Sequence, residues 1–230
     1  MKSNPFNLDI LFEDNHLIII NKRPGDIVQG DKTGDLPLSE IVKLYIKEKY
    51  HKPGNVFLGV VHRLDRPTSG AVIFARTSKA LSRLNEQLKE RKIKKTYWAI
   101  IKGKPKVEQA KLTHYLKKNS KNNKSSAYDS IVEGSKKAIL NYHLIGSSDN
   151  YSLLEVDLET GRHHQIRAQL SKMKMPIKGD LKYGFPRSNK NKGISLHARK
   201  LEFIHPVKKG TIKLTAPTPP DDLWDKFFTP

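Results

Sequence analysis

The sequence of 230 residues contains no cysteine, and this absence excludes several kinds of chemistry. Disulfides, thiolate metal sites and cysteine nucleophiles are all ruled out together. No apolar run approaches the ~20 residues that a helix needs to cross a bilayer. The first residues, Met1–Pro5, also lack the apolar core of a signal peptide. We therefore expect a cytoplasmic protein that does not engage a membrane.

Acidic residues are scarce relative to basic ones, at 23 Asp and Glu against 43 Lys and Arg. The formal net charge of +20 attracts polyanions over the whole surface. Nucleic acid is the partner that this charge favours, because contacts to phosphates release bound counterions. A basic solubilising surface is the simpler alternative. An anionic membrane is less favoured, because no basic amphipathic helix with a bulky apolar face is evident.

Short apolar runs separated by turn residues recur along the chain, and they predict more strands than helices. We expect strands at about 8–13, 16–21, 56–61, 71–75, 93–102, 137–145, 151–158, 195–204 and 211–215. Helical spacing predicts helices at about 37–50, 78–91 and 162–173. Most strands are linked as hairpins, so the predicted class is α+β with a largely antiparallel sheet. No break in composition separates a second domain from the first.

Two helix starts and one tail complete this outline. Threonine and serine cap helix amino termini, so Thr77 or Ser78 is expected to cap the second predicted helix and Thr160 the third. The tail is predicted to end in a short aromatic helix or turn with Trp224, Phe227 and Phe228.

The stretch from Lys102 to Lys124 is strongly basic, and residues 117–126 contain almost no apolar side chains. We interpret residues 117–126 as an exposed, mobile loop. Two roles fit this loop: a passive insert, or an arm that contacts phosphates.

One loop, between the apolar runs 56–61 and 71–75, carries a single acid, Asp65, between Arg63 and Arg66. Pro67 and Gly70 follow, so the chain turns sharply there. Neighbouring cations would keep this carboxylate ionised. Taken alone, an ordinary charged hairpin loop is the simpler interpretation.

Motifs of several large enzyme classes are missing from the sequence. There is no phosphate-binding GxxxxGK[ST], no GxGxxG after a strand, no HExxH and no GxSxG. His163 and His164 are adjacent in a predicted helix, so they point in different directions and cannot chelate one metal ion. With no cysteine and no carboxylate–histidine cluster, we expect no metal site.

A lone carboxylate is poorly suited to hydrolysing a glycosidic bond, which normally needs two. Asp65 fits better a reaction at a sugar carbon in which the leaving group stays bound and returns. Arg167 is the type of residue that would pair with such an acid and orient it. Tyr97, between basic residues of a predicted strand, could stack on a base.

Five motifs, in order, resemble those of the RluA-type RNA pseudouridine synthases. Residues 62–70 match HRLDxxTSG, residues 95–97 match KxY, and residues 160–167 match TGRxHQIR. Residues 176–184 match PIxGDxxYG, and residues 196–198 with 205–206 match LHA followed by HP. The agreement runs from about residue 8 to residue 220. One small departure is Asn21–Gly25, where the proline of the family's pattern is displaced by one position.

This resemblance implies a pseudouridine synthase fold, with residues 1–230 as a single catalytic domain. It implies isomerisation of specific uridines to pseudouridine in structured RNA, either ribosomal or transfer RNA. No cofactor or metal would be needed, because the reaction is redox-neutral and leaves nothing to hydrolyse. Many relatives carry an amino-terminal RNA-binding module of the S4 type. Fewer than ten residues precede the first predicted strand here, so we expect no such module and, by default, a monomer.

The resemblance also implies roles for particular residues. Asp65 would be the ionised catalytic carboxylate, acting either as a nucleophile at C1′ or as a base at C2′. Tyr97 would pack on the uracil, Arg167 would pair with Asp65, and Arg63 could occupy the space left by a flipped nucleotide. Further substrate-binding residues are expected to be Arg162, His164, Gln165, Ile166 and Leu196.

Two alternatives remain open from the sequence. Ile166 and Leu196 fit plain core packing as well as they fit the wall of a base pocket. The whole chain could also be a non-catalytic RNA-binding or ribosome-assembly factor, because its charge alone would serve that role. Such a factor would not require Asp65, Tyr97 and Arg167 together.

Overall fold

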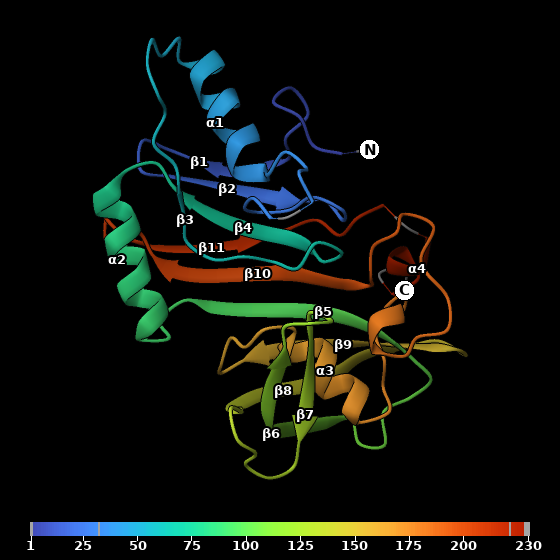
Figure 1. The fold of residues 1–230 in the computed structure, drawn as a ribbon. Coiled ribbons are helices and arrows are strands. Elements are labelled where there is room, and N and C mark those ends of the chain that lie inside the picture. The colour runs from blue at the N-terminus through green and yellow to red at the C-terminus, as the bar shows by residue number, and fades with distance from the viewer. Residues whose placement is uncertain (1, 32, 221, 228–230) are drawn as a thin grey trace. The chain divides into compact units, whose positions relative to one another are not determined.

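The structure is a computed structural model that describes residues 2–31, 33–220 and 222–227. Runs of consecutive strands with a few helices between them make up the chain (Figure 1), which confirms the predicted α+β class. The chain divides into two compact units, the first from Met1–Lys94 with Ala198–Thr218 and the second from Lys95–His197 with Pro219–Pro230. The expectation of one catalytic domain over residues 1–230 stays a prediction, because compact units of this kind can belong to one domain.

The first unit is a sheet with two helices. Its elements are β1 (Ile10–Glu13), β2 (Leu17–Lys22), α1 (Leu38–Lys49), β3 (Gly59–Val60), β4 (Ser69–Ala75), α2 (Ser78–Lys89), the part of β10 (Leu196–Ile204) from Ala198 onward, and β11 (Thr211–Thr215). The strands lie in the order β1-β2-β4-β10, with β3 also beside β4 and β11 beside β10. The pairs β1–β2, β2–β4, β3–β4 and β10–β11 are antiparallel, in agreement with the predicted largely antiparallel sheet.

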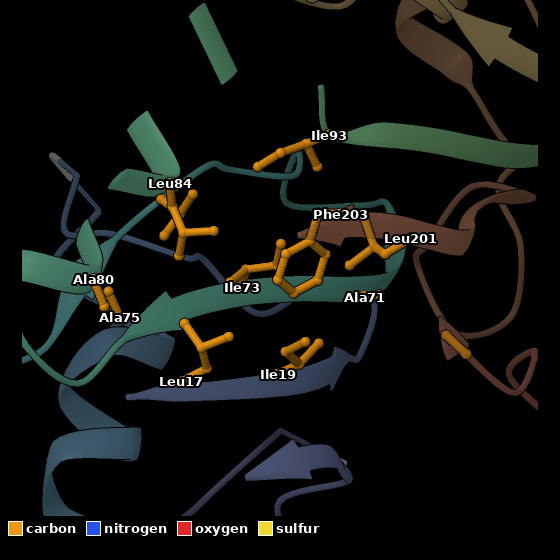
Figure 2. Close-up of a cluster of buried hydrophobic side chains, with 12 residues drawn as sticks. Leu17, Ile19, Ala71, Ile73, Ala75, Ala80, Leu84, Ile93, Leu201 and Phe203 are labelled. Carbon is orange, nitrogen blue, oxygen red and sulfur yellow. The ribbon is translucent and has the colours of Figure 1, made fainter. Parts of the chain in front are cut away.

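Alternating apolar residues build the core of this unit. Leu17 and Ile19 of β2 are two residues apart, so they lie on one face of the sheet. They pack in one cluster with Ile73 of β4, Leu84 of α2 and Phe203 of β10, all of them fully or almost fully buried (Figure 2). Every residue of β4 is buried. The motif loop that precedes β4 is therefore attached to the best-packed strand of the unit.

The second unit is an antiparallel sheet with helical segments. Its elements are β5 (Lys94–Lys102), β6 (Gln109–Asn119), β7 (Lys124–Tyr128), β8 (Lys136–Ser147), β9 (Tyr151–Leu158), α3 (Gln165–Lys172), the 3-10 helix η1 (Leu181–Tyr183) and α4 (Asp222–Asp225). The strands lie in the order β5-β9-β8-β6-β7, and each neighbouring pair is antiparallel. Helix α3 packs against β6 and β7.

Local predictions about helix and chain ends are partly confirmed. The Thr77 hydroxyl accepts a hydrogen bond from the Ala80 amide, so Thr77, one of the two predicted candidates, caps α2 and Ser78 begins the helix. Trp224 of α4 is buried, and Phe227 packs against its cluster. Phe228, the third aromatic residue of the predicted tail, lies outside the described residues.

The prediction of a mobile loop at residues 117–126 is wrong. These residues form the end of β6, a turn and the start of β7, with Lys117 opposite Ser126 and Asn119 opposite Lys124. Alternate residues of β6 are buried, among them Leu112 and Leu116, and this period of two is the signal of a half-buried strand. The density of lysines on the exposed positions hid that period.

The predicted start of the third helix is also wrong. Helix α3 begins at Gln165, and His164 precedes it in the left-handed conformation, with φ of 53°. The Thr160 hydroxyl donates to the Gln165 side-chain oxygen, and the same oxygen accepts the Arg162 amide. This side chain holds the segment from 160 to 164 in a turn, so Arg162 and His163 lie before the helix rather than in it.

Candidate active site

The loop that carries Asp65 lies between β3 and β4, and paired backbone holds both of its ends. Gly59 lies opposite Ala75 and Val60 opposite Phe74, so the predicted strand–loop–strand unit is confirmed. Within the loop, the Thr68 amide donates to the Asp65 carbonyl at 3.0 Å and closes a turn. The Asp65 side chain is half-buried and that of Arg63 is exposed.

A fully buried lysine fastens this loop to the rest of the first unit. The Lys22 ammonium donates to the carbonyl oxygens of Arg23 at 3.0 Å, Asp26 at 2.8 Å and Arg66 at 3.0 Å. The Arg66 carbonyl also accepts the Gly25 amide at 2.8 Å. Since all three ammonium protons are used, Lys22 fixes the backbone of Arg66, the residue directly after Asp65.

Burial also changes the acidity of this lysine. Removal from water lowers the pKa of Lys22 to about 7, while the nearby carboxylates of Asp26 and Asp65 act in the opposite direction. The Arg66 guanidinium adds to the lowering. The pKa of Lys22 therefore depends directly on the charge of Asp65.

The Arg66 side chain is held by a different acid. It forms an ion pair with Asp35, which also accepts a hydrogen bond from Lys2 at 2.6 Å. The Arg66 side chain therefore fastens the Asp65 loop to the segment around Asp35.

Glycine is required at position 70, where the motif loop enters β4. Gly70 has φ of 112°, a conformation that side chains rarely adopt. A Cβ at this position would lie 2.4 Å from the carbonyl oxygen and 2.5 Å from the nitrogen of Ala198 in β10. The last glycine of the HRLDxxTSG motif therefore allows two strands of the first unit to approach closely.

In the second unit, a buried ion pair organises the TGRxHQIR segment. Arg167 donates from Nε to Asp180 Oδ2 at 2.7 Å and from a terminal nitrogen to Asp180 Oδ1 at 2.9 Å. The side chains are 5% and 1% exposed, so this two-point pair is shielded from water. The guanidinium carbon also lies 4.9 Å from the centre of the Tyr183 ring. The pair thus sets the direction of the guanidinium.

Sequence reasoning missed the supporting role of Asp180 and Tyr183. Tyr183 accepts a hydrogen bond from the Ser125 amide at 2.8 Å and lies 3.0 Å from His164 Nδ1. Both residues belong to the PIxGDxxYG motif, which the sequence shows without any indication of its partners. The spacing inside a motif does not say which other motif its side chains contact.

The remaining predicted site residues of the second unit lie on β5, at the start of α3 and at the start of β10. Tyr97 is buried in β5, opposite Val156 of β9. Gln165 is buried and fixes the turn before α3, as described above. Ile166 and Leu196 are each 4% exposed. Packing of that kind is compatible with both of the roles left open for them.

The structure brings several predicted site residues together around the start of α3, and places others elsewhere. Asp65 and Arg63 belong to the first unit, whereas the other predicted site residues belong to the second. The pairing of Arg167 with Asp65 and the substrate contacts of all these residues stay predictions. Within the described ranges, no group of three or more His, Asp or Glu side chains is arranged to hold a metal ion. No helix in the described part of the chain is long and apolar enough to span a membrane.

Comparison with known proteins identifies the class to which this fold and these motifs belong. Residues 16–172 match the family model described as RNA pseudouridylate synthase. The chain therefore belongs to the RNA pseudouridine synthase family, and the predicted resemblance is confirmed.

Individual relatives agree with this assignment. An uncharacterized RNA pseudouridine synthase of Synechocystis is 37% identical over 92% of this chain and 66% of its own length. The ribosomal large subunit pseudouridine synthase C of Buchnera aphidicola is 36% identical, over 92% of this chain and 67% of its own. The tRNA pseudouridine synthase C of Vibrio parahaemolyticus is 28% identical over 98% and 95%. The chain spans about two thirds of the length of the first two relatives.

Solved structures agree in fold. The human RNA pseudouridylate synthase domain containing 4 superposes with a TM-score of 0.76 at 24% identity, covering 92% of this chain and 88% of its own. The human RNA pseudouridylate synthase domain containing 1 superposes with a TM-score of 0.73 at 22% identity, covering 100% and 98%.

Proposed function

We propose that this protein isomerises specific uridines in structured RNA to pseudouridine, with Asp65 as its catalytic carboxylate. The observation that carries the proposal is the loop of Asp65, which matches the family motif and is fixed through Lys22, Arg66 and Gly70. A single acid held this firmly is suited to a reaction that needs one precisely placed carboxylate.

The chemistry breaks the bond between N1 of uracil and C1′ of ribose. The uracil then rotates while it stays bound, and its C5 forms a new bond to C1′. The proton on C5 leaves and N1 gains one, so no atom is added to the RNA or lost from it. Asp65 acts at the sugar, either by adding to C1′ or by removing a proton from C2′. Tyr97 packs on the uracil, and Arg167 holds the carboxylate of Asp65.

The RNA target is ribosomal or transfer RNA. Relatives named for both kinds of RNA support this range, together with the net charge of +20. We expect the protein to work in the cytoplasm, as a monomer and without a cofactor.

The test compares Asp65→Ala and Asp65→Asn with the wild type. RNA carrying tritium at C5 of uridine releases that tritium when pseudouridine forms, so release from bulk tRNA and from large-subunit rRNA measures the reaction. We expect each variant to lose at least ~10³-fold in rate while it still binds RNA, because a group that acts on the reacting atoms is removed. Asp149→Ala, which removes an exposed acid from the β8–β9 turn, is the matched control and should keep the wild-type rate.

An Asp65→Ala protein that forms pseudouridine at the wild-type rate would exclude the proposed role of Asp65. The alternative, a non-catalytic RNA-binding or assembly factor, makes a different prediction. A deletion strain would then be rescued equally by the wild type and by Asp65→Ala, and no pseudouridine would be missing from its rRNA or tRNA.

A further inference from the structure

A pocket of about 270 Å³ opens in the second unit beside the β6–β7 hairpin. Lys118, Ser125, Lys136, Gly161, Arg162 and His163 are among the residues that line it. No Asp or Glu is among the described residues that line this basic pocket. Lys118, Lys136 and Arg162 give it three basic side chains.

The sheet itself brings most of these side chains to one face. Lys118 of β6 lies opposite Ser125 of β7, and Leu116 of β6 lies opposite Lys136 of β8. Because Leu116 and Lys118 are two residues apart, all four side chains project from the same face. The basic pocket is therefore a product of strand register, which the expected loop at 117–126 would not have provided.

The three cations of the basic pocket are not neutralised by acids. Within the described part of the chain, no carboxylate forms an ion pair with Lys118, Lys136 or Arg162. Other lysines of the same unit do have such partners, since Lys111 lies 2.7 Å from Glu159 and Lys172 lies 2.8 Å from Asp129. Converging positive charges without a carboxylate are costly for a fold unless an anion joins them.

Hydrogen bonds orient the polar groups of the basic pocket in advance. Arg162 donates from Nε to the Lys137 carbonyl at 3.0 Å, which leaves its two terminal amino groups to face a ligand. His163 Nδ1 lies 2.9 Å from the Ser125 hydroxyl. The His163 ring also stacks on the His164 ring at 3.8 Å between centroids, so its direction is fixed. The two rings therefore do not point in different directions, as the predicted helix required, because both residues precede α3.

A fourth cation lies at the Gly161 edge. A Cβ built on Gly161 would lie 3.8 Å from the amine of Lys95, a half-buried residue of β5. Among the described residues, Lys95 forms no hydrogen bond or ion pair. Burial lowers the pKa of Lys95, and an anion bound nearby would oppose that shift.

We propose that the basic pocket binds a backbone phosphate of the RNA substrate. This inference rests on the proposed function. A guanidinium with two donors to offer, two lysine ammonium groups and a serine hydroxyl are the groups that recognise phosphate oxygens. The described lining includes no Phe, Tyr or Trp, and its one imidazole ring, His163, already stacks on His164, so phosphate-binding groups dominate the site. The contact therefore positions the strand without reading its sequence.

The test removes two of the charges and compares two salt conditions. The double variant Lys118→Gln/Lys136→Gln is compared with Lys104→Gln/Lys106→Gln, which removes two exposed lysines of the same unit outside the basic pocket. Fluorescence anisotropy with a labelled single-stranded RNA dodecamer gives Kd across a range of salt concentrations. We expect the pocket variant to lose roughly 10-fold in affinity near physiological salt and to flatten the slope of log K against log salt by roughly 0.7 per lost phosphate contact.

A second measurement locates the anion. Two glycines that line the basic pocket, Gly134 and Gly161, serve as reporters. Inorganic phosphate should shift their backbone amide signals in ¹⁵N NMR spectra of the wild type, and not in those of the pocket variant. The proposal would be overturned if the two double variants bound RNA with equal affinity. It would also be overturned if phosphate shifted the amide signal of neither glycine. The readouts are binding and not turnover, so they stand apart from the Asp65 experiment. Pocket-dependent binding with no pseudouridine formed would refute the proposed function alone.

Discussion

Replacing Lys22 with methionine tests whether the buried ammonium holds the Asp65 loop. Methionine has a similar length and fills the space, but it cannot donate to the carbonyls of Arg23, Asp26 and Arg66. The Arg66 carbonyl keeps its bond from the Gly25 amide at 2.8 Å. The Asp26 carbonyl loses the shortest of the three hydrogen bonds from Lys22, at 2.8 Å, and is therefore affected most.

A buried carbonyl without a donor costs about 1–3 kcal/mol, and the carbonyls of Arg23 and Arg66 each lose one hydrogen bond as well. Burying a methionine in place of a charged amine offsets part of this. We expect a net loss of about 3 kcal/mol, which lowers Tm by roughly 6–12 °C for a chain of this size. The loop of Asp65 would also shift, so the rate of pseudouridine formation below Tm should fall roughly 10- to 100-fold.

The pH dependence gives this prediction its own signature. The pKa of Lys22 is lowered from 10.5 to about 7 in the folded state. Between these two pH values the unfolded chain keeps a proton that the folded chain has lost, so raising the pH favours folding. The stability gap between the wild type and Lys22→Met should therefore widen from pH 7 to pH 9.

Thermal melts followed by circular dichroism at both pH values provide the assay, with Lys47→Met on the exposed face of α1 as the control. A Lys22→Met protein that melts with this control, and shows no change of the gap with pH, would refute the reasoning. In that case the hydrogen bonds of Lys22 would not stabilise the Asp65 loop, and packing alone would hold the loop in place.

Three further substitutions test other contacts. Gly70→Ala should cost about 3 kcal/mol or more in urea unfolding, because the added Cβ meets the Ala198 backbone at 2.4 Å; equal stability would mean that the strands separate easily there. Asp180→Asn should cost about 3 kcal/mol by the same measurement, since it removes the carboxylate that accepts two hydrogen bonds from buried Arg167; a loss below about 1 kcal/mol would contradict this. Burial raises the pKa of the Asp14 carboxyl, but the hydrogen bonds it accepts outweigh this and lower the pKa to about 2. Its ionised form therefore stabilises the fold above pH 3.8 by about 2 kcal/mol, and this stabilisation is lost as the pH falls toward 2. In thermal melts from pH 5 to 2.5, the difference in stability between the wild type and Asp14→Asn should shrink. A difference that stays constant would refute the reasoning.

The sequence by itself determined the elements whose signals are local. Apolar and helical spacing predicted the hairpin at about 8–21 and the helices at about 37–50 and 78–91, close to the observed β1–β2, α1 and α2, because each pattern concerns only the residues that carry it. The Thr77 cap is equally local, since the hydroxyl meets an amide three residues away. The motifs likewise gave the family, because residue identity and order are properties of the chain.

The tertiary structure decided what depends on distant partners. Residues 117–126 pair as strands because buried positions of β6 and the neighbouring β8 supply a template, which a local count of lysines does not reveal. Lysine is a residue type that normally lies on the surface, so nothing in the sequence indicates that Lys22 is buried. Its burial depends on three carbonyl groups that converge on its ammonium. The Arg167–Asp180 pair joins α3 to the residue that precedes η1. The close approach of Gly70 to Ala198 joins β4 to β10, which are far apart in sequence. Burial and pairing of this kind depend on three-dimensional proximity, and for that reason the supports of the candidate site and its basic pocket were visible only in the fold.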